Sequence, residues 1–162
     1  MLEDNPRVVF DCNVFVQSLA NEESDAARAF ELVEEGAITL FVSDEVLAEI
    51  WDVLNRSYIR QLMPRINDQR VTALFQRLEQ KAIHIKNVPE EFQYERDPKD
   101  ERYINLALVA SARYLVSKDK DLLDLMHPSV DGSPSFFNRY PMLKILKVSA
   151  SLSEIEKWRS EP

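Results

Sequence analysis

The chain has 162 residues, of which 45% are hydrophobic and 30% charged, and its formal net charge is −8 at pH 7. This length and composition predict a single domain over residues 1–162 with a hydrophobic core, and they exclude a disordered chain. The negative charge argues against a general basic groove for nucleic acid but allows a local one.

Strand-like and helix-like segments alternate along the chain. Apolar and β-branched runs predict strands at 7–10, 37–42, 83–88, 113–117 and 143–149. Helical periodicity and capping residues predict helices at 13–19, 24–35, 44–57, 69–82, 97–112, 121–126 and 151–162. Ser24 and Ser43 are placed to cap the second and third helices, and Gly36 to end the second.

The alternation predicts an α/β domain. Right-handed crossovers would give a mostly parallel central sheet of four to five strands, with helices on both faces. Binding sites in such sheets form beyond the carboxyl ends of the strands. The segment 127–141 is rich in Pro and Ser and predicts a long loop, for which an insertion is favoured over a partner-contact loop.

Acidic residues follow the first and fourth predicted strands. Asp11 comes directly after "RVVF", with Asn13 two residues later, and either residue can cap the next helix. Asp119 and Asp121 follow the strand that ends near Ser117, and again one acid suffices as a cap. Each strand end therefore carries one polar residue more than capping requires.

Two predicted helices supply further acids. In the helix after Ser43, Glu49 lies at the edge of the apolar stripe, whereas Glu45 and Asp52 point away from it. Before Pro98, Asp97 is placed as an N-cap. Asp100 instead lies on the apolar face of its helix, where a carboxylate is costly unless a cation or a hydrogen-bond donor faces it.

Carboxylates gathered at one sheet edge would repel one another unless a cation compensated for their charge. Mg²⁺ and Mn²⁺ prefer oxygen ligands, so the pattern predicts a site for one or two such ions. No Cys/His spacing suits zinc, and the chain has neither a Gly-rich phosphate loop nor a G-x-S-x-G elbow. Phosphodiester hydrolysis is the chemistry that most often uses an acidic site of this kind.

The ordered segments "FDCNVFV", "VSDEVLAEIWDVL" and "RDPKDERYINLALVASARYLVSKDKDLL" resemble the PIN-domain ribonucleases, most closely the PIN-family toxins of toxin–antitoxin systems. The resemblance covers about residues 7–125. It implies a catalytic and metal-binding set, Asp11, Glu49, Asp100 and Asp119, supported by Asn13, Ser117, Asp97 and Asp121. Cys12 and Ser117 stand where the family often has Thr.

The resemblance implies a Mg²⁺- or Mn²⁺-dependent endoribonuclease that cuts single-stranded or structured RNA, acts as a toxin and is inhibited by an antitoxin. Two alternatives remain: a PIN-like binding or assembly module without turnover, which the acidity supports, and a metal-dependent hydrolase of small phosphorylated substrates. Local cations that would contact RNA are Arg56, Arg60, Arg65, Arg70, Arg96, Arg102, Lys118 and Lys120.

The expected partners are RNA, an antitoxin and a second copy of the chain. A homodimer follows from the resemblance and from apolar residues that a small domain buries with difficulty, namely Phe136, Phe137, Tyr140, Met142 and Trp158. The alternative is that the loop folds back and buries them. A single cysteine, the absence of a signal peptide and the absence of an apolar run near 20 residues predict a cytoplasmic protein without a membrane span.

Overall fold

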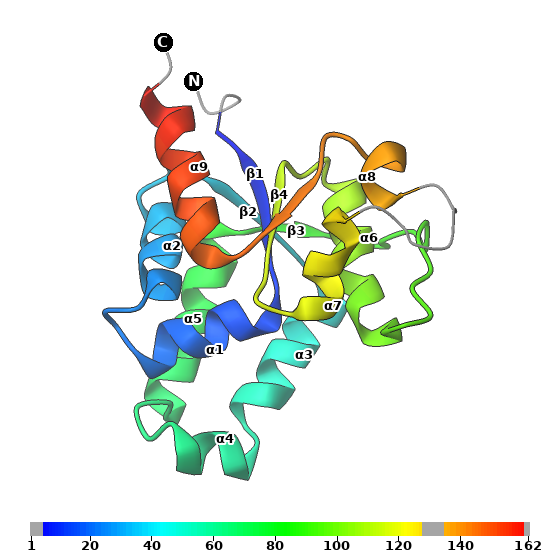
Figure 1. Ribbon diagram of the computed structural model, residues 1–162. Coiled ribbons are helices and arrows are strands. Elements are labelled where there is room, and N and C mark those ends of the chain that lie inside the picture. Colours follow the sequence, from blue (N-terminus) through cyan, green and yellow to red (C-terminus); the bar gives the residue numbers. More distant parts are fainter. Residues whose placement is uncertain (1–4, 128–134, 161–162) are drawn as a thin grey trace.

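The computed structural model describes residues 5–127 and 135–160 of the chain. Its centre is a five-stranded parallel sheet with strand order β3-β2-β1-β4-β5 (Figure 1). The strands are β1 (Arg7–Phe10), β2 (Thr39–Ser43), β3 (Ile83–Ile85), β4 (Tyr114–Val116) and β5 (Lys144–Leu146). The predicted α/β class and parallel sheet are confirmed.

Helices cover both faces of this sheet. The α-helices are α1 (Cys12–Ala20), α2 (Asp25–Glu34), α3 (Asp44–Leu54), α4 (Ser57–Leu62), α5 (Asp68–Lys81), α6 (Glu101–Val109), α7 (Lys120–Leu123), α8 (Phe136–Arg139) and α9 (Val148–Ser160). Two 3₁₀ turns are η2 (Pro98–Asp100) and η3 (Asp124–Met126). Helix α6 packs against β1, β2 and β4, while α1, α2 and α9 group together on the other side of the strands (Figure 1). Among the described residues, no helix is both long enough and apolar enough to cross a membrane.

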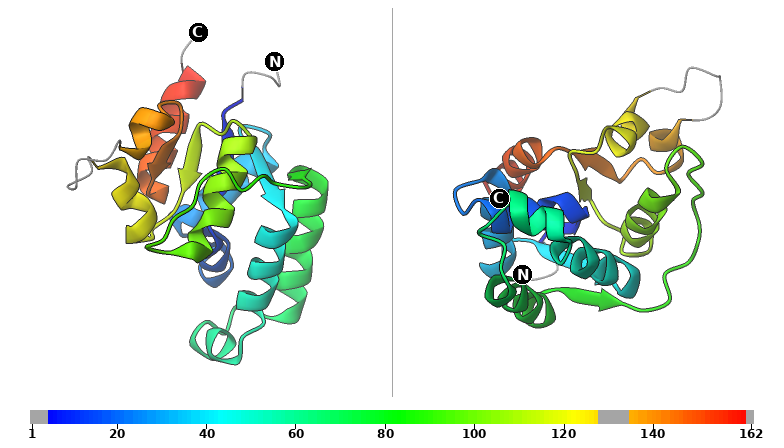
Figure 2. Two further views of the ribbon diagram at one scale, coloured as in Figure 1. Left: turned by 90° about the vertical axis from the view of Figure 1, so that its right-hand side faces the viewer. Right: turned by 90° about the horizontal axis from the view of Figure 1, so that it is seen from below.

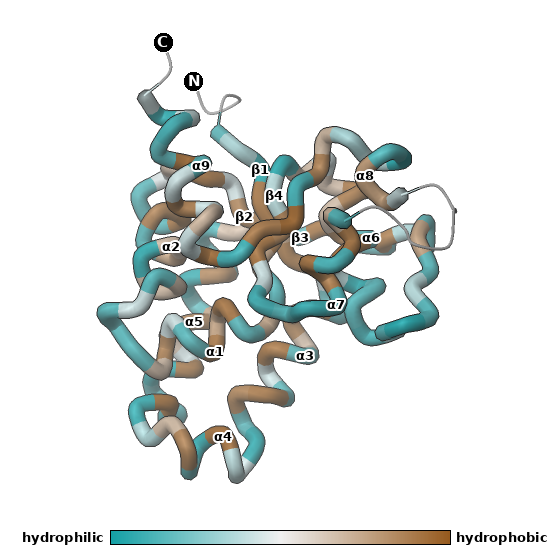
Figure 3. The backbone as a smooth tube through the Cα atoms, viewed as in Figure 1, coloured by the Kyte–Doolittle hydropathy of each residue, from teal (hydrophilic) through white to brown (hydrophobic). Residues whose placement is uncertain are grey.

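The core lies where the sheet meets these helices. Strands β1 and β4 are buried along most of their length. The hydrophobic residues concentrate at the centre of the molecule (Figure 3). Val8 pairs with Tyr114 and Phe10 with Val116, so the two strands run side by side and end at the same edge. This register places the residues after Phe10 beside those after Val116.

Local capping explains where the helices begin. The Ser24 hydroxyl accepts a hydrogen bond from the Ala27 N–H at 3.1 Å, and the Ser43 hydroxyl accepts one from the Val46 N–H at 3.2 Å. Both caps satisfy amide groups that a helix start leaves without partners. Gly36 adopts φ 76°, a conformation that glycine tolerates, just after the end of α2. These three predictions from the sequence are confirmed.

Several predicted boundaries differ from the structure. Strand β2 begins at Thr39 rather than at residue 37, and β3 ends at Ile85, two residues before Asn87 with its positive φ of 58°. Helix α9 begins at Val148, three residues before the predicted start, and the Ser151 hydroxyl donates to the Val148 carbonyl at 2.6 Å within the helix instead of capping it. Helix α4 was not predicted; with α3 and α5 it forms an arm that projects from the sheet (Figure 2).

The predicted long loop contains helix α8, and its residues 128–134 lie outside the described residues. The Phe136 side chain is only 6% exposed, and its ring lies 5.0 Å from that of Phe92, measured between centroids. The expectation that Phe136 is exposed is therefore wrong, and the alternative in which the segment folds back is correct for this residue. Met142 remains 68% exposed.

Candidate metal centre

Asp11 occupies the junction between β1 and α1. Its backbone N–H donates to the Val116 carbonyl at 2.9 Å, which fixes it beside the end of β4. One carboxylate oxygen, Oδ1, accepts from the Cys12 N–H at 2.7 Å and so caps α1. The other, Oδ2, accepts from the Asn13 amide at 3.0 Å and from the Ser117 hydroxyl at 2.5 Å.

Ser117 connects Asp11 to the next acid in the site. Its hydroxyl oxygen also accepts the Asp119 N–H at 2.9 Å while its proton goes to Asp11. Asp119 in turn caps α7, because its Oδ1 accepts the Asp121 N–H at 2.9 Å. Cap and site are therefore not alternatives for Asp11 and Asp119, since one carboxylate oxygen serves the cap in each residue.

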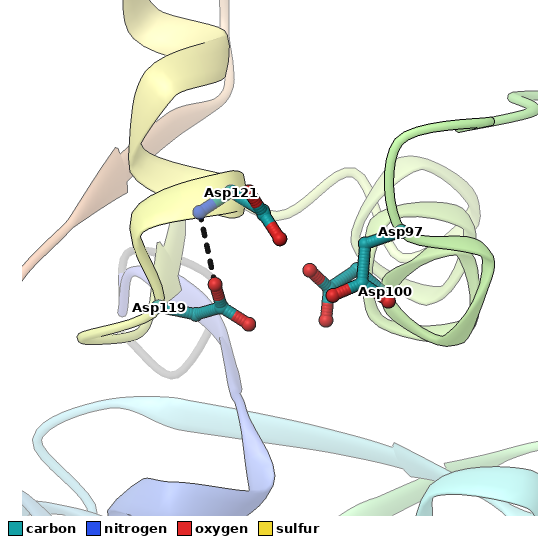
Figure 4. A group of neighbouring side chains, drawn as sticks. All are labelled: Asp97, Asp100, Asp119 and Asp121. Atoms are coloured by element: carbon teal, nitrogen blue, oxygen red, sulfur yellow. Dashed lines mark hydrogen bonds between the residues drawn. The ribbon is translucent and has the colours of Figure 1, made fainter.

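Four aspartates meet at this edge of the sheet. Asp97, Asp100, Asp119 and Asp121 each offer a carboxylate oxygen, and these oxygens all lie within 4.8 Å of one another. Figure 4 shows Asp119 and Asp121 at the start of α7, facing Asp97 and Asp100 at the start of the α6 segment. We call these four residues the aspartate cluster. Asp97 also caps η2 by accepting the Lys99 N–H at 3.2 Å, as predicted.

The site opposes ionisation of its most buried acids. Asp100 is 6% exposed, and burial, followed by the charges of Asp119, Asp11 and Asp97, raises its pKa to about 8. Burial also raises the pKa of Asp11 to about 6, with smaller contributions from Asp119 and Glu49, although the Ser117 and Cys12 hydrogen bonds act in the opposite direction. The metal-free site therefore favours a proton on Asp100 at neutral pH.

The aspartate cluster fits a hard divalent cation. All its donors are carboxylate oxygens, the ligands that Mg²⁺ and Mn²⁺ prefer. Asp100 Oδ2 is buried and has no hydrogen-bond partner among the described residues, so it leaves an acceptor that a cation would satisfy. The inward direction that the sequence predicted for Asp100 is the direction that the structure shows.

Glu49 lies beside this centre but outside the aspartate cluster. It projects from α3, where its Oε1 accepts the Tyr103 hydroxyl at 2.5 Å and its Oε2 lies 3.3 Å from an Arg102 Nη1. The negative charge of Glu49 raises the pKa of Asp11. Of the eight site residues predicted from the sequence, the structure gathers Asp97, Asp100, Asp119 and Asp121 and joins Asp11 to them through Ser117. The Asn13 amide donates a hydrogen bond to Asp11, and Glu49 lies outside the aspartate cluster.

Sequence reasoning missed Tyr94 and Tyr103 at this site, and it named Arg96 only as an RNA contact. The Arg96 Nε lies 2.6 Å from Asp121 Oδ1, and its Nη2 donates to Asp124 Oδ2 at 2.8 Å. The Tyr94 hydroxyl donates to the Asp121 carbonyl at 2.7 Å. These contacts tie the segment before η2 to α7. The local sequence does not indicate the ion pairs of Arg96 or the hydrogen bonds of Tyr94 and Tyr103, because their partners lie in other segments.

We expect Glu45→Gln and Asp52→Asn to be nearly silent. Both side chains are exposed, and Asp52 forms a surface ion pair with Arg56 at 2.6 Å, which contributes little to stability. The free energy of unfolding should change by less than about 0.5 kcal/mol in each variant, measured by urea denaturation. Metal affinity should also be unchanged, and a loss caused by Glu45→Gln but not by Glu49→Gln would contradict the assignment within α3.

Comparison with known proteins agrees with this geometry. The model of the PIN domain family matches residues 7–121. An uncharacterized protein of Methanocaldococcus jannaschii, MJ1680, is 28% identical over 119 residues, which cover 74% of each chain. The crystal structure of PAE2754 from Pyrobaculum aerophilum shares the fold, with a TM-score of 0.55 and 14% identity over 95% of this chain and 91% of that one. The family match spans both segments that supply the aspartate cluster, and the chain belongs to the PIN-domain family.

Proposed function

We propose that this protein is a Mg²⁺- or Mn²⁺-dependent endoribonuclease that hydrolyses phosphodiester bonds in RNA. PIN domains are typically metal-dependent nucleases, so the family supports the reaction class. The observation that carries the proposal is the aspartate cluster, in which Asp100 has an orphaned buried oxygen and a raised pKa. A bound divalent ion would supply a water of lowered pKa and a Lewis acid for the phosphate.

The chain's own residues have distinct roles in this proposal. Asp97, Asp100, Asp119 and Asp121 hold one or two ions. Asp11 and Glu49 add negative charge to the same centre, which favours bound cations over an empty site. Ser117 and Asn13 fix the Asp11 carboxylate through hydrogen bonds at 2.5 and 3.0 Å.

Contacts to RNA phosphates need cations, and most candidates are paired with acids. Lys118 is exposed, lies next to Asp119 in the sequence and forms no ion pair within the described part of the chain. Arg96 and Arg102 are partly exposed at the edge of the centre, and each guanidinium has N–H donors beyond those that face Asp121, Asp124 and Glu49, which can contact a phosphate. We propose that these three residues bind the backbone of a single-stranded or structured RNA.

We further propose a cytoplasmic toxin that forms a homodimer and is inhibited by an antitoxin. The motif order of the PIN-family toxins supports the toxin role. Exposed apolar side chains at Met142 (68% exposed) and Val109 (40% exposed) support a protein interface. Light scattering of the purified protein would measure the dimer directly.

A nuclease assay with labelled single-stranded RNA tests the proposed function. Cleavage should require added Mg²⁺ or Mn²⁺ and should stop with excess EDTA, because the acidic centre cannot activate water without the cation. Titration of Mn²⁺ in the same samples separates the alternatives. Metal binding without cutting of RNA would favour a binding module, and cutting of small phosphate esters alone would favour the other hydrolase. Absence of metal binding would exclude the proposal.

A further inference from the structure

The buried side chain of Tyr103 donates a hydrogen bond to Glu49. Tyr103 lies on α6 and is only 1% exposed. It donates to Glu49 Oε1 at 2.5 Å. This contact spans 54 residues of sequence and joins α6 to α3.

Tyr103 is the donor in its contact with Glu49. Burial strongly raises the pKa of its hydroxyl, and the charges of Cys12, Asp11 and Glu49 add to this effect. The phenol therefore keeps the proton that it donates to Glu49. Because an ionised carboxylate only accepts hydrogen bonds, the pair has a single arrangement, with Tyr103 donating and Glu49 accepting.

Helix α6 also contacts the other carboxylate oxygen of Glu49. Arg102, the residue before Tyr103, lies 3.3 Å from Glu49 Oε2 and approaches from a partly exposed position. The Glu49 side chain is itself only 20% exposed. Two adjacent residues of α6 thus hold both oxygens of the Glu49 carboxylate, whose charge raises the pKa of Asp11.

We propose that Tyr103 is a positioning residue, which fixes the Glu49 carboxylate beside the metal centre and so strengthens cation binding there. The inference rests on the proposed function, since it assigns Glu49 to the same centre. Hydrogen-bonded partners of this kind orient the acids around a metal, and their removal typically weakens metal affinity about 10- to 100-fold.

Tyr103→Phe tests the inference, because it removes the hydroxyl and preserves the ring in the core. Mn²⁺ affinity, measured by calorimetry, should fall about 10-fold. Tyr114→Phe is the matched control: Tyr114 is equally buried, at 1% exposed, but begins β4 at the end away from Ser117. Its affinity should equal that of the wild type.

A double-mutant cycle shows whether Tyr103 acts through Glu49. Glu49→Gln should weaken Mn²⁺ binding, and adding Tyr103→Phe to it should cause no further loss. Unchanged affinity in Tyr103→Phe, or additive losses in the double variant, would overturn the inference. If the wild type itself binds no Mn²⁺, the proposed function fails instead, so the two failures are distinguishable.

A measurement on the wild-type protein tests the inference even if the Tyr103→Phe variant does not fold. In protein labelled with ¹³C at the tyrosine Cζ, Mg²⁺ titration should shift the Tyr103 signal, because its acceptor Glu49 responds to the cation. The Tyr114 signal should stay in place. A Tyr103 signal that stays constant while Mg²⁺ binds would equally overturn the inference.

Discussion

Asp119→Asn should abolish metal-dependent cleavage of RNA while leaving the fold intact. Asp119 belongs to the aspartate cluster and receives the Ser117 link to Asp11, so its charge serves the proposed centre directly. Loss of hydrogen-bonded partners around a metal already costs about 10- to 100-fold, so loss of an acid in the cluster should cost at least about 100-fold in cleavage rate. Initial rates with saturating Mn²⁺ measure this effect.

The same substitution separates a catalytic role from a structural one. Asn is as good an N-cap as Asp, so α7 should retain its cap. Removal of one of several like charges should leave the metal-free protein equally stable or more stable, and Asp11→Asn should behave in the same way. Asp25→Asn, at an exposed first-turn position of α2, is the control. A large fall in metal-free stability with normal cleavage would show that Asp119 is only a cap.

Asp100→Asn should stabilise the metal-free protein at pH 8, and by a smaller amount at pH 5. The pKa of Asp100 is about 8 in the folded protein, above its ordinary value of 3.8. Between these two values the folded state holds more protons than the unfolded state, so the free energy of unfolding falls as pH rises. The amide carries no charge and escapes this penalty. We expect a gain on the order of a few kcal/mol at pH 8, because each pKa unit between the folded and unfolded states corresponds to about 1.4 kcal/mol.

Urea denaturation in EDTA at pH 5 and at pH 8 measures this difference. The wild type should lose stability between the two conditions relative to Asp100→Asn, and Asp11, with a pKa of about 6, contributes in the same direction. Saturating Mn²⁺ should reverse the order at pH 8, because only the wild-type carboxylate binds the cation strongly. Equal stability of the two proteins at pH 8 in EDTA would mean that Asp100 finds a partner in the metal-free protein.

Much of the site could be predicted because its acids lie at strand ends and helix starts, which the local sequence indicates. Asp11 and Asp119 follow apolar strands, and Asp97 precedes Pro98 as a helix cap. Asp100 lies on the apolar face of its helix, so periodicity alone gave its inward direction. The sequence could not predict which of the acids belong to the aspartate cluster. Asp97 and Asp121 seemed secondary to Glu49, yet the structure puts both in the aspartate cluster and leaves Glu49 outside it.

By itself the sequence determined the α/β class, the caps at Ser24 and Ser43 and the acidic ends of β1 and β4. These features depend on backbone hydrogen bonds and side-chain periodicity within about ten residues. Only the tertiary structure decided that Ser117 donates to Asp11 across 106 residues and that Tyr103 donates to Glu49 across 54. It also decided that Phe136 packs on Phe92. Such pairs arise from strand order and helix packing, which bring distant segments together and leave no periodic trace in either segment.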